Sequence, residues 1–343
     1  YHAELRYLLK EAVPWAPAGF VVAACQFPMT GLARGRIQHG KLPALTTRED
    51  EPHIVITGKG FRILFDRRNG ALASLTSGGE EVVVGPLLPS FTRPLTDNDR
   101  RGWKPHLIME EWYQAKPLLK NIALLTPESG TVKVKSRYSV IAGKAEADVI
   151  YTVAGNGTVK VTCELHADTG LPFLPKVGMQ CAIHNDLRTV TWFGRGEPEN
   201  YCDRRTGMDA AVYTLPLAQF LEPYVMPQEN GNRTDVRWMY LSDNSSGGLL
   251  VVADSLLSMS ARPYTDAMIH GARHTHELRE AGFITLNIDL VQMGVGGNDT
   301  WSDVARPAAP YMIPAGEYSC TFYLVPGKLS GKDLKKVPLS VKF

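Results

Sequence analysis

The sequence predicts a mainly β protein built from two large antiparallel sheets. Apolar residues recur at every second position through most of the 343 residues, which is the period of strands with one buried face. Glycine-containing turns interrupt this alternation at short intervals, as hairpins require. No segment has a convincing helical period, and the 31 glycines and 23 prolines suit a chain with many turns and long loops.

The chain divides unevenly. Residues 1–29 read as strand-like pieces around VPWAPAGF. An all-β piece of this length cannot bury a core of its own, so we expect it to be the end of a preceding β-sandwich domain. Residues 30–48 carry no apolar period and are predicted to be a linker. The main domain is expected at 49–326, before a polar and peripheral tail at 327–343.

Two runs of hairpins form the most regular part of the main domain. The first run, residues 53–84, breaks into four short strands at Gly58, Gly60, Gly70 and Gly78. The second run follows at 131–165 and contains three strands. Their predicted inward faces comprise Val132, Val134, Tyr138 and Val140; Ala145, Ala147, Val149, Tyr151 and Val153; and Val159, Val161, Cys163 and Leu165.

Further strands are expected at GGLLVVADSLLSMSA and EYSCTFYLV, both of which read as buried. The best candidate for a helix is EEWYQAKPLLKNIALL. Pro117 interrupts it, because proline lacks the backbone donor that a helix interior needs.

Composition excludes several classes of function. A net charge of +2, with no run of like charges, disfavours a nucleic-acid partner. No apolar stretch is long enough to cross a bilayer, and the first residues lack the pattern of a signal peptide. The five cysteines are widely spaced and are expected to be free thiols. Because the chain starts without methionine inside a strand-like segment, we expect it to be a piece of a longer protein.

QMGVGGNDTW places three glycines before Asn298, Asp299 and Trp301. A phosphate loop would need a helix directly after the glycines, and the next residues have no helical period. Trp301 is then either a core ring or a presented ring, with the glycines acting as its hinge. A presented indole suits a sugar, whose C–H face stacks on it while Asn and Asp bind hydroxyls.

FTRPLTDNDRRGWKPH offers Asp97 and Asp99, which would share a face on a strand. They resemble an acid/base pair, but glycosidase carboxyls must flank the sugar from opposite sides. A turn held by Asx hydrogen bonds is the simpler interpretation. The loop that follows is a better candidate for ligand contact through Arg101 and Trp103.

PYVMPQENGNRTDVRWMYL is the densest polar cluster, and Arg233, Asp235 and Arg237 would share one face of a strand. A buried ion-pair network and a polyol-binding surface both explain it. In the second case Glu229, Asn232, Arg233 and Arg237 would contact sugar.

Two further polar segments have structural explanations. HGARHTHE places His274 and His276 on one predicted strand face. Zinc needs a third ligand and an open position, and neither is evident, so no metal site is assigned. WFGRGEPENYCDRRTG is a long loop whose charges are expected to pair internally.

Four stretches, in this order, resemble signatures of the C-terminal part of bacterial β-galactosidases of glycoside hydrolase family two: FTRPLTDND, WFGRGEPENYCDR, PYVMPQENGNRTDVRW and QMGVGGNDTW. In addition, LKEAVPWAPAGFVVAACQF is similar to the end of the immunoglobulin-like domain that precedes this part. The resemblance covers nearly the whole chain.

The resemblance implies a two-sheet super-sandwich of the galactose mutarotase type at 49–326, after an immunoglobulin-like fragment at 1–29. In the family, the catalytic glutamates and magnesium lie on a separate TIM barrel, where sodium is a further candidate. This chain lacks the alternating strands and helices of a barrel. We therefore expect it to contain no catalytic residue, metal or cofactor, and to be inactive when isolated.

The resemblance also implies a contribution to the rim of the active site. Trp301 matches the family tryptophan that stacks on the sugar, and Asn298 stands where the family often has Asp. Residues 100–106 match a loop that borders the same pocket, although RRGWKPH is shorter and more basic than in the best-known members.

The implied whole enzyme is a retaining, homo-oligomeric β-galactosidase that cleaves lactose-like β-galactosides, in cytoplasm or periplasm. Its barrel and a carbohydrate would be the partners of this chain, with no nucleic acid or membrane. Two alternatives stay open. In the first, the chain is a stand-alone mutarotase-like domain that binds sugar or acts as an aldose epimerase. In the second, it is a separate subunit whose partner carries the barrel.

Overall fold

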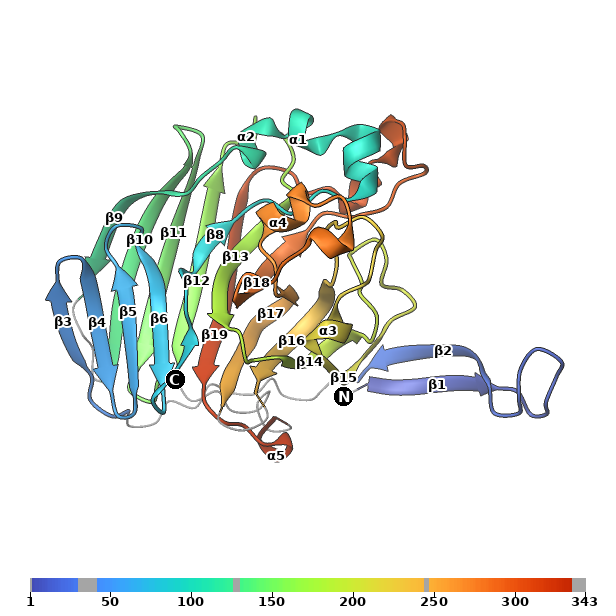
Figure 1. The fold of residues 1–343 in the computed structure, drawn as a ribbon, viewed down its shortest axis with the longest axis horizontal. Coiled ribbons are helices and arrows are strands. Elements are labelled where there is room, and N and C mark those ends of the chain that lie inside the picture. The colour runs from blue at the N-terminus through green and yellow to red at the C-terminus, as the bar shows by residue number, and fades with distance from the viewer. Residues whose placement is uncertain (1, 30–41, 126–129, 244–246, 335–343) are drawn as a thin grey trace.

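The computed structural model describes residues 2–29, 42–125, 130–243 and 247–334. Most of the predicted linker and the end of the predicted tail, residues 335–343, lie outside this range. The described residues form antiparallel strands with short helical turns between them (Figure 1). This confirms the mainly β prediction. In the described part of the chain, no helix is both long and apolar enough to span a membrane.

The first strands form a separate two-stranded sheet. β1 (His2–Leu8) pairs with β2 (Val21–Pro28), and this hairpin extends away from the other strands (Figure 1). Nearly all its side chains are exposed, including Trp15 at 68%. Gln26 connects it to the main body, because its side chain accepts from the Ala210 amide at 2.7 Å and donates to the Ala210 carbonyl.

One large sheet begins with a meander of five strands and continues through four more. The meander comprises β3 (Thr46–Asp50), β4 (His53–Gly58), β5 (Phe61–Asp66), β6 (Ala71–Ser77) and β7 (Glu80–Val83). Its end and the short β8 (Leu88–Ser90) pair with β13 (Lys176–His184). β13 pairs with β18 (Phe283–Gln292), and β18 with β17 (Gly248–Arg262).

The second sheet lies behind the first in Figure 1 and also reaches β17. Its strand order is β9 (Leu118–Leu124), β10 (Thr131–Ile141), β11 (Ala145–Ala154), β12 (Val159–Ala167), β19 (Glu317–Pro326) and β17. It continues through β16 (Arg233–Ser242), β14 (Thr189–Gly196) and β15 (Asp209–Pro216). The 15-residue β17 is therefore a member of both sheets.

The core fills the space between these sheets. Phe65 on β5 and Tyr151 on β11 are both fully buried, and their ring centroids lie 5.0 Å apart. Each buried aromatic ring of this kind stabilises the fold by roughly 1.5 to 3 kcal/mol relative to an exposed one. All the inward-facing residues predicted for β10, β11 and β12 are buried, so period-two alternation identified their faces correctly.

The helix candidate and β3 differ from the sequence prediction. The helix candidate is helical only at α2 (Glu110–Tyr113), and the residues after Pro117 form β9 instead. β3 falls partly in the predicted linker, and none of its residues is fully buried. An edge strand without a buried face leaves no apolar period in the sequence.

Short helical turns gather at one end of the sheets, at the top of Figure 1. Those shown there include η1 (Asn98–Trp103), α1 (Pro105–Ile108), α2 and α4 (Asp266–Gly271). The others are α3 (Leu217–Phe220), η2 (Thr275–Glu277), η3 (Asp303–Ala305), η4 (Ala309–Tyr311) and α5 (Gly331–Leu334). The structure also keeps all five cysteines as free thiols.

Candidate functional site

Trp301 lies on the loop between β18 and η3, and 77% of its surface is exposed. The tryptophans at positions 103, 112, 192 and 238 are all buried. Leaving such a large apolar surface in water forgoes the stabilisation that burial would give. Within this chain, Trp301 is therefore a presented ring and not a core ring.

Two side chains, the buried Arg93 and the partly buried Asp203, hold the start of the Trp301 loop. The Arg93 guanidinium donates to the Met293 carbonyl at 2.7 Å and to the Gly294 carbonyl at 2.8 Å. Asp203 Oδ2 accepts the amides of Val295 and Gly296, each at 2.8 Å. Backbone donors and acceptors are thus satisfied in a segment without regular structure.

Asp299 shapes the end of the loop. Its Oδ1 accepts the Trp301 amide at 3.2 Å and the Ser302 amide at 3.0 Å, while its Oδ2 accepts the Ser302 hydroxyl at 2.5 Å. The Ser302 hydrogen bond is the main reason that the pKa of Asp299 is lowered. This carboxylate is therefore engaged in orienting the Trp301 backbone. Asn298 is exposed, and its backbone N–H donates to the Val304 carbonyl at 2.8 Å.

Two of the loop glycines allow close packing. An added Cβ at Gly297 would lie 2.2 Å from the Ala305 carbonyl oxygen, and one at Gly294 would lie 2.5 Å from Asp203 Oδ2. Gly294, Gly296 and Gly297 are absent from the positive-φ residues. Close approach of neighbouring atoms is thus one reason for glycine at positions 294 and 297, and the hinge stays a prediction.

The TDND segment forms a buried turn and not a strand. Asp99 Oδ2 accepts the Thr96 amide at 3.0 Å and lies 3.4 Å from the Arg93 guanidinium. Asp99 Oδ1 accepts the Trp103 indole N–H at 2.9 Å. Asp97 and Asp99 therefore do not share a strand face, and Asp99 holds the turn together as the Asx interpretation expected.

The two predicted contact residues after this turn have different environments. Arg101 is exposed, whereas Trp103 is only 4% exposed and packs in the core. η1 also contacts the Trp301 loop. Asn98 Nδ2 donates to the Asp299 carbonyl at 3.2 Å, and a Cβ added at Gly102 would lie 2.2 Å from Ala305 Cβ. Arg101 and Trp301 thus lie on segments that contact each other, whereas Trp103 belongs to the core.

The PQENGNR segment joins the same cluster of loops. Arg100 donates to the Pro227 carbonyl at 3.0 Å, and the Asp97 amide donates to the Gln228 side chain at 3.0 Å. Together with Asp203, these contacts bring all four signature segments to one place. The chain separates them by up to about 200 positions, as in the Asn98 to Asp299 pair.

The four residues proposed as sugar contacts in this segment are mostly buried. Glu229 Oε2 accepts from Arg262 at 3.0 Å, and the Asn232 side chain donates to the Asn200 carbonyl at 2.8 Å. Arg233 is 1% exposed and lies 4.2 Å from the centroid of the Phe220 ring. Burial lowers the pKa of Arg233 to about 10. Only Arg237 is partly exposed.

The predicted common face of Arg233, Asp235 and Arg237 is wrong. Arg233 packs over Trp192 and Arg237 over Phe193, which are successive residues of β14 and so point to opposite faces. The register of β16 shifts between Arg233 and Val236, and Asp235 has φ 53°. A β-bulge of this kind reverses the alternation of side chains.

Two open hollows flank the glycine loop. One has a volume of about 470 Å³ and is lined by residues that include Asp203, Asn298 and Tyr311. The other, of about 430 Å³, lies beside Asn98, Arg204 and Thr300. Both hollows are lined by polar residues of the loops that surround the glycines, although Trp301 itself lines neither of them.

Sequence reasoning missed the residues that fix this loop, namely Arg93, Asn98 and Asp203. Each lies within a signature segment, so the resemblance pointed to the right segments. It gave no indication that these side chains bind the backbone of a distant loop, because such pairings depend on the tertiary fold.

Comparisons with known proteins identify the family of this chain. Residues 57–324 match the model of a family described as the β-galactosidase small chain. A β-galactosidase from Priestia megaterium is 32% identical over 93% of this chain, and the matched part is 31% of the relative. One from Streptococcus thermophilus is 32% identical over 94% of the chain and 31% of the relative. The chain thus spans about a third of the length of these relatives.

The solved structures that match the chain have low sequence identity. A putative aldose 1-epimerase from Escherichia coli has a TM-score of 0.45 and 8% identity, covering 83% of this chain and all of the other. A galactose 1-epimerase from Lactobacillus acidophilus has a TM-score of 0.43 and 10% identity, covering 82% and 99%.

Proposed function

Because the chain belongs to the β-galactosidase small-chain family, we propose that it forms part of a β-galactosidase that releases terminal β-D-galactose from lactose-like substrates. Its relatives are about three times as long. The catalytic glutamates and the magnesium ion would belong to a barrel outside this chain. The whole enzyme would act with retention, through a covalent galactosyl intermediate.

The role proposed for this chain is to bind carbohydrate at the rim of that active site. The observation that carries the proposal is Trp301, a 77% exposed indole on a loop whose backbone amides are held by the Asp203 carboxylate. A fixed ring loses little entropy when a sugar stacks on it. Arg101 and Asn298, both exposed, would offer donors and acceptors to the sugar hydroxyls.

An aldose epimerase is less well supported. Such an enzyme needs an accessible acid and base on either side of the anomeric carbon. Glu229, the carboxylate considered for this task, is 4% exposed and paired with Arg262. Optical rotation of galactose, followed with and without the protein, would reveal any catalysed mutarotation.

The test of the rim proposal is Trp301→Ala in the whole enzyme. A stacked ring contributes about 0.5 to 1.5 kcal/mol beyond its buried area, so KM for lactose should rise about 2- to 12-fold. Thermal stability should stay nearly unchanged, since the ring is exposed, and Trp301→Phe should restore part of the affinity. Loss of thermal stability with unchanged kinetics would contradict the proposal.

A further inference from the structure

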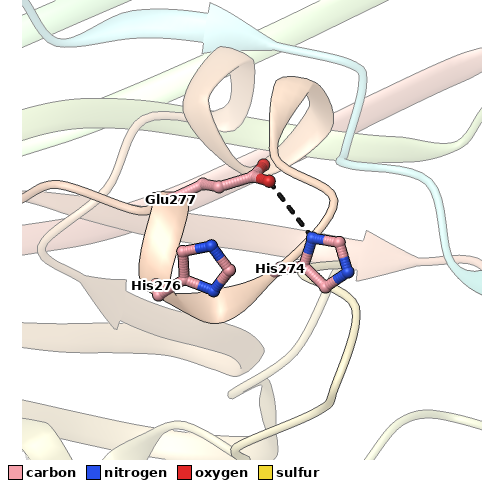
Figure 2. A group of neighbouring side chains, drawn as sticks. All are labelled: His274, His276 and Glu277. Atoms are coloured by element: carbon pink, nitrogen blue, oxygen red, sulfur yellow. Dashed lines mark hydrogen bonds and ion pairs between the residues drawn. The ribbon is translucent and has the colours of Figure 1, made fainter.

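His274, His276 and Glu277 lie together on the exposed turn between α4 and β18 (Figure 2). The structure forms a 3₁₀ turn here, where alternation predicted a strand, and this turn adds Glu277 to the two histidines. Each residue offers one ligand atom, and these atoms all lie within 4.8 Å of one another. We propose that this turn binds a divalent transition-metal ion, for which Zn²⁺ is the natural probe.

The distances within the cluster approach those around a bound metal. His274 Nδ1 and Glu277 Oε1 are 3.1 Å apart. Two ligands at about 2.0 to 2.1 Å from a tetrahedral Zn²⁺ stand about 3.3 to 3.4 Å from each other. An ion would therefore replace the proton shared by this pair with almost no movement of either side chain. His276 has to approach by a small change of rotamer, which its exposed position allows.

The turn also holds these side chains in place. Glu277 Oε2 accepts the Arg273 amide at 2.8 Å, which leaves Oε1 directed at His274. The rings of His274 and His276 are stacked, with centroids 5.4 Å apart and planes inclined by 18° (Figure 2).

The ligand types indicate which metals fit. Two imidazoles and one carboxylate suit Zn²⁺, Co²⁺, Ni²⁺ or Cu²⁺, whereas Mg²⁺ and Ca²⁺ prefer sites made of oxygen atoms. The side chains of His274 and Glu277 are 59% and 41% exposed, so water has access to the fourth position. In the described residues, this is the only such group of three or more His, Cys, Asp or Glu ligands.

Metal binding would also affect a neighbouring cavity. Thr275 and Leu278, on the same turn, line a cavity of about 260 Å³ together with Tyr224, Tyr264 and Arg262. An ion that joins His274 to Glu277 fixes the backbone between them. The turn would then form a rigid wall of that cavity.

The experiment measures Zn²⁺ bound to the whole protein by equilibrium dialysis, with excess Mg²⁺ present to occupy oxygen-ligand sites. The wild type should bind one more Zn²⁺ per chain than His276→Ala. Even the loss of outer-shell partners weakens metal sites 10- to 100-fold, so the loss of a direct ligand should weaken this one by more than about 100-fold. Glu277→Gln should weaken it as well.

His270→Ala provides the matched control, because His270 is exposed on the preceding helix and is not one of the three ligands. It should retain the full Zn²⁺ stoichiometry, and circular dichroism should show that every variant folds. Equal stoichiometry in wild type and His276→Ala would overturn the proposal. Loss of Zn²⁺ binding in His270→Ala but not in the other variants would show that the ligands are wrongly assigned.

Discussion

Asp203 and Gly296 are 93 positions apart in the chain, yet the Asp203 carboxylate accepts the Gly296 amide at 2.8 Å. The same oxygen accepts the Val295 amide. One carboxylate from the loop after β14 therefore sets the path of the backbone that leads to Trp301. The position of the presented ring depends on a residue that lies outside its own loop.

Replacing this carboxylate should loosen the Trp301 loop. In Asp203→Ala, the amides of Val295 and Gly296 lose their acceptor, and we expect their hydrogen exchange to accelerate about tenfold or more, as the loss of a charge-assisted bond of 1.5 to 3 kcal/mol implies. Exchange measured by mass spectrometry on residues 293–301 checks this. Asp254→Asn, an exposed substitution on β17, should leave that segment unchanged.

The effects of Asp203→Ala and Trp301→Ala on KM should not add. If Asp203 acts by placing the ring, its removal has little further effect once the ring is absent, and a double-mutant cycle would measure this coupling. Strictly additive changes in KM would show that Asp203 does not act through Trp301.

Gly297 and Gly296 should respond differently to a methyl group. At Gly297 an added Cβ would lie 2.2 Å from the Ala305 carbonyl oxygen, whereas at Gly296 the nearest atom, Asp203 Oδ2, would lie 3.4 Å away. Gly297→Ala should therefore destabilise the protein by about 1 to 3 kcal/mol, and Gly296→Ala should have little effect. Thermal unfolding compares the two. Similar losses in both would point to a need for flexibility.

Asp99→Asn should strongly destabilise the protein, because Arg93 would then remain charged, buried and without its carboxylate. Both side chains are almost completely buried, at 0% and 1% exposure. Removing one partner of such a pair costs about 3 to 5 kcal/mol. Trp103→Phe keeps the Arg93–Asp99 pair and removes the indole hydrogen bond to Asp99, worth about 1 kcal/mol, together with part of a buried ring. Chemical denaturation would rank the two variants.

Asp289 should make stability depend on pH. Burial raises its pKa from 3.8 to about 6, despite Lys176 at 3.1 Å. Between these values the folded state binds the proton more firmly than the unfolded state does. The contribution of Asp289 to the free energy of unfolding is therefore most favourable below pH 3.8. It decreases by about 3 kcal/mol as the pH rises to about 6. Asp289→Asn should remove this slope from a plot of unfolding free energy against pH.

Asp148 provides the opposite case for comparison. The Arg137 guanidinium lowers its pKa from 3.8 to about 2. Its stabilising contribution is complete above pH 3.8 and is lost as pH falls to about 2. Asp148→Asn should therefore change the plot of unfolding free energy against pH only in this more acidic range. Between pH 4 and 6 its slope should equal that of the wild type, so this variant is the control for Asp289→Asn.

Local sequence patterns predicted the hairpins well, because a buried face such as that of β11 repeats at every second residue. They failed at β3, which has no buried face, and at Asp235, where a bulge changes the register of β16. The sequence itself singled out Trp301 and Arg101 as candidate contacts, and the family resemblance then favoured a presented ring for Trp301. Asp203 and Arg93 were not found, because a side chain that binds the backbone of a distant loop leaves no periodic signal.

β17 belongs to both sheets, since it pairs with β16, β18 and β19. Separating β17 from its neighbours therefore removes hydrogen-bonded partners from both sheets. We expect the two sheets to unfold in one cooperative transition, so that a destabilising change in β3–β8 also lowers the stability of β14–β16.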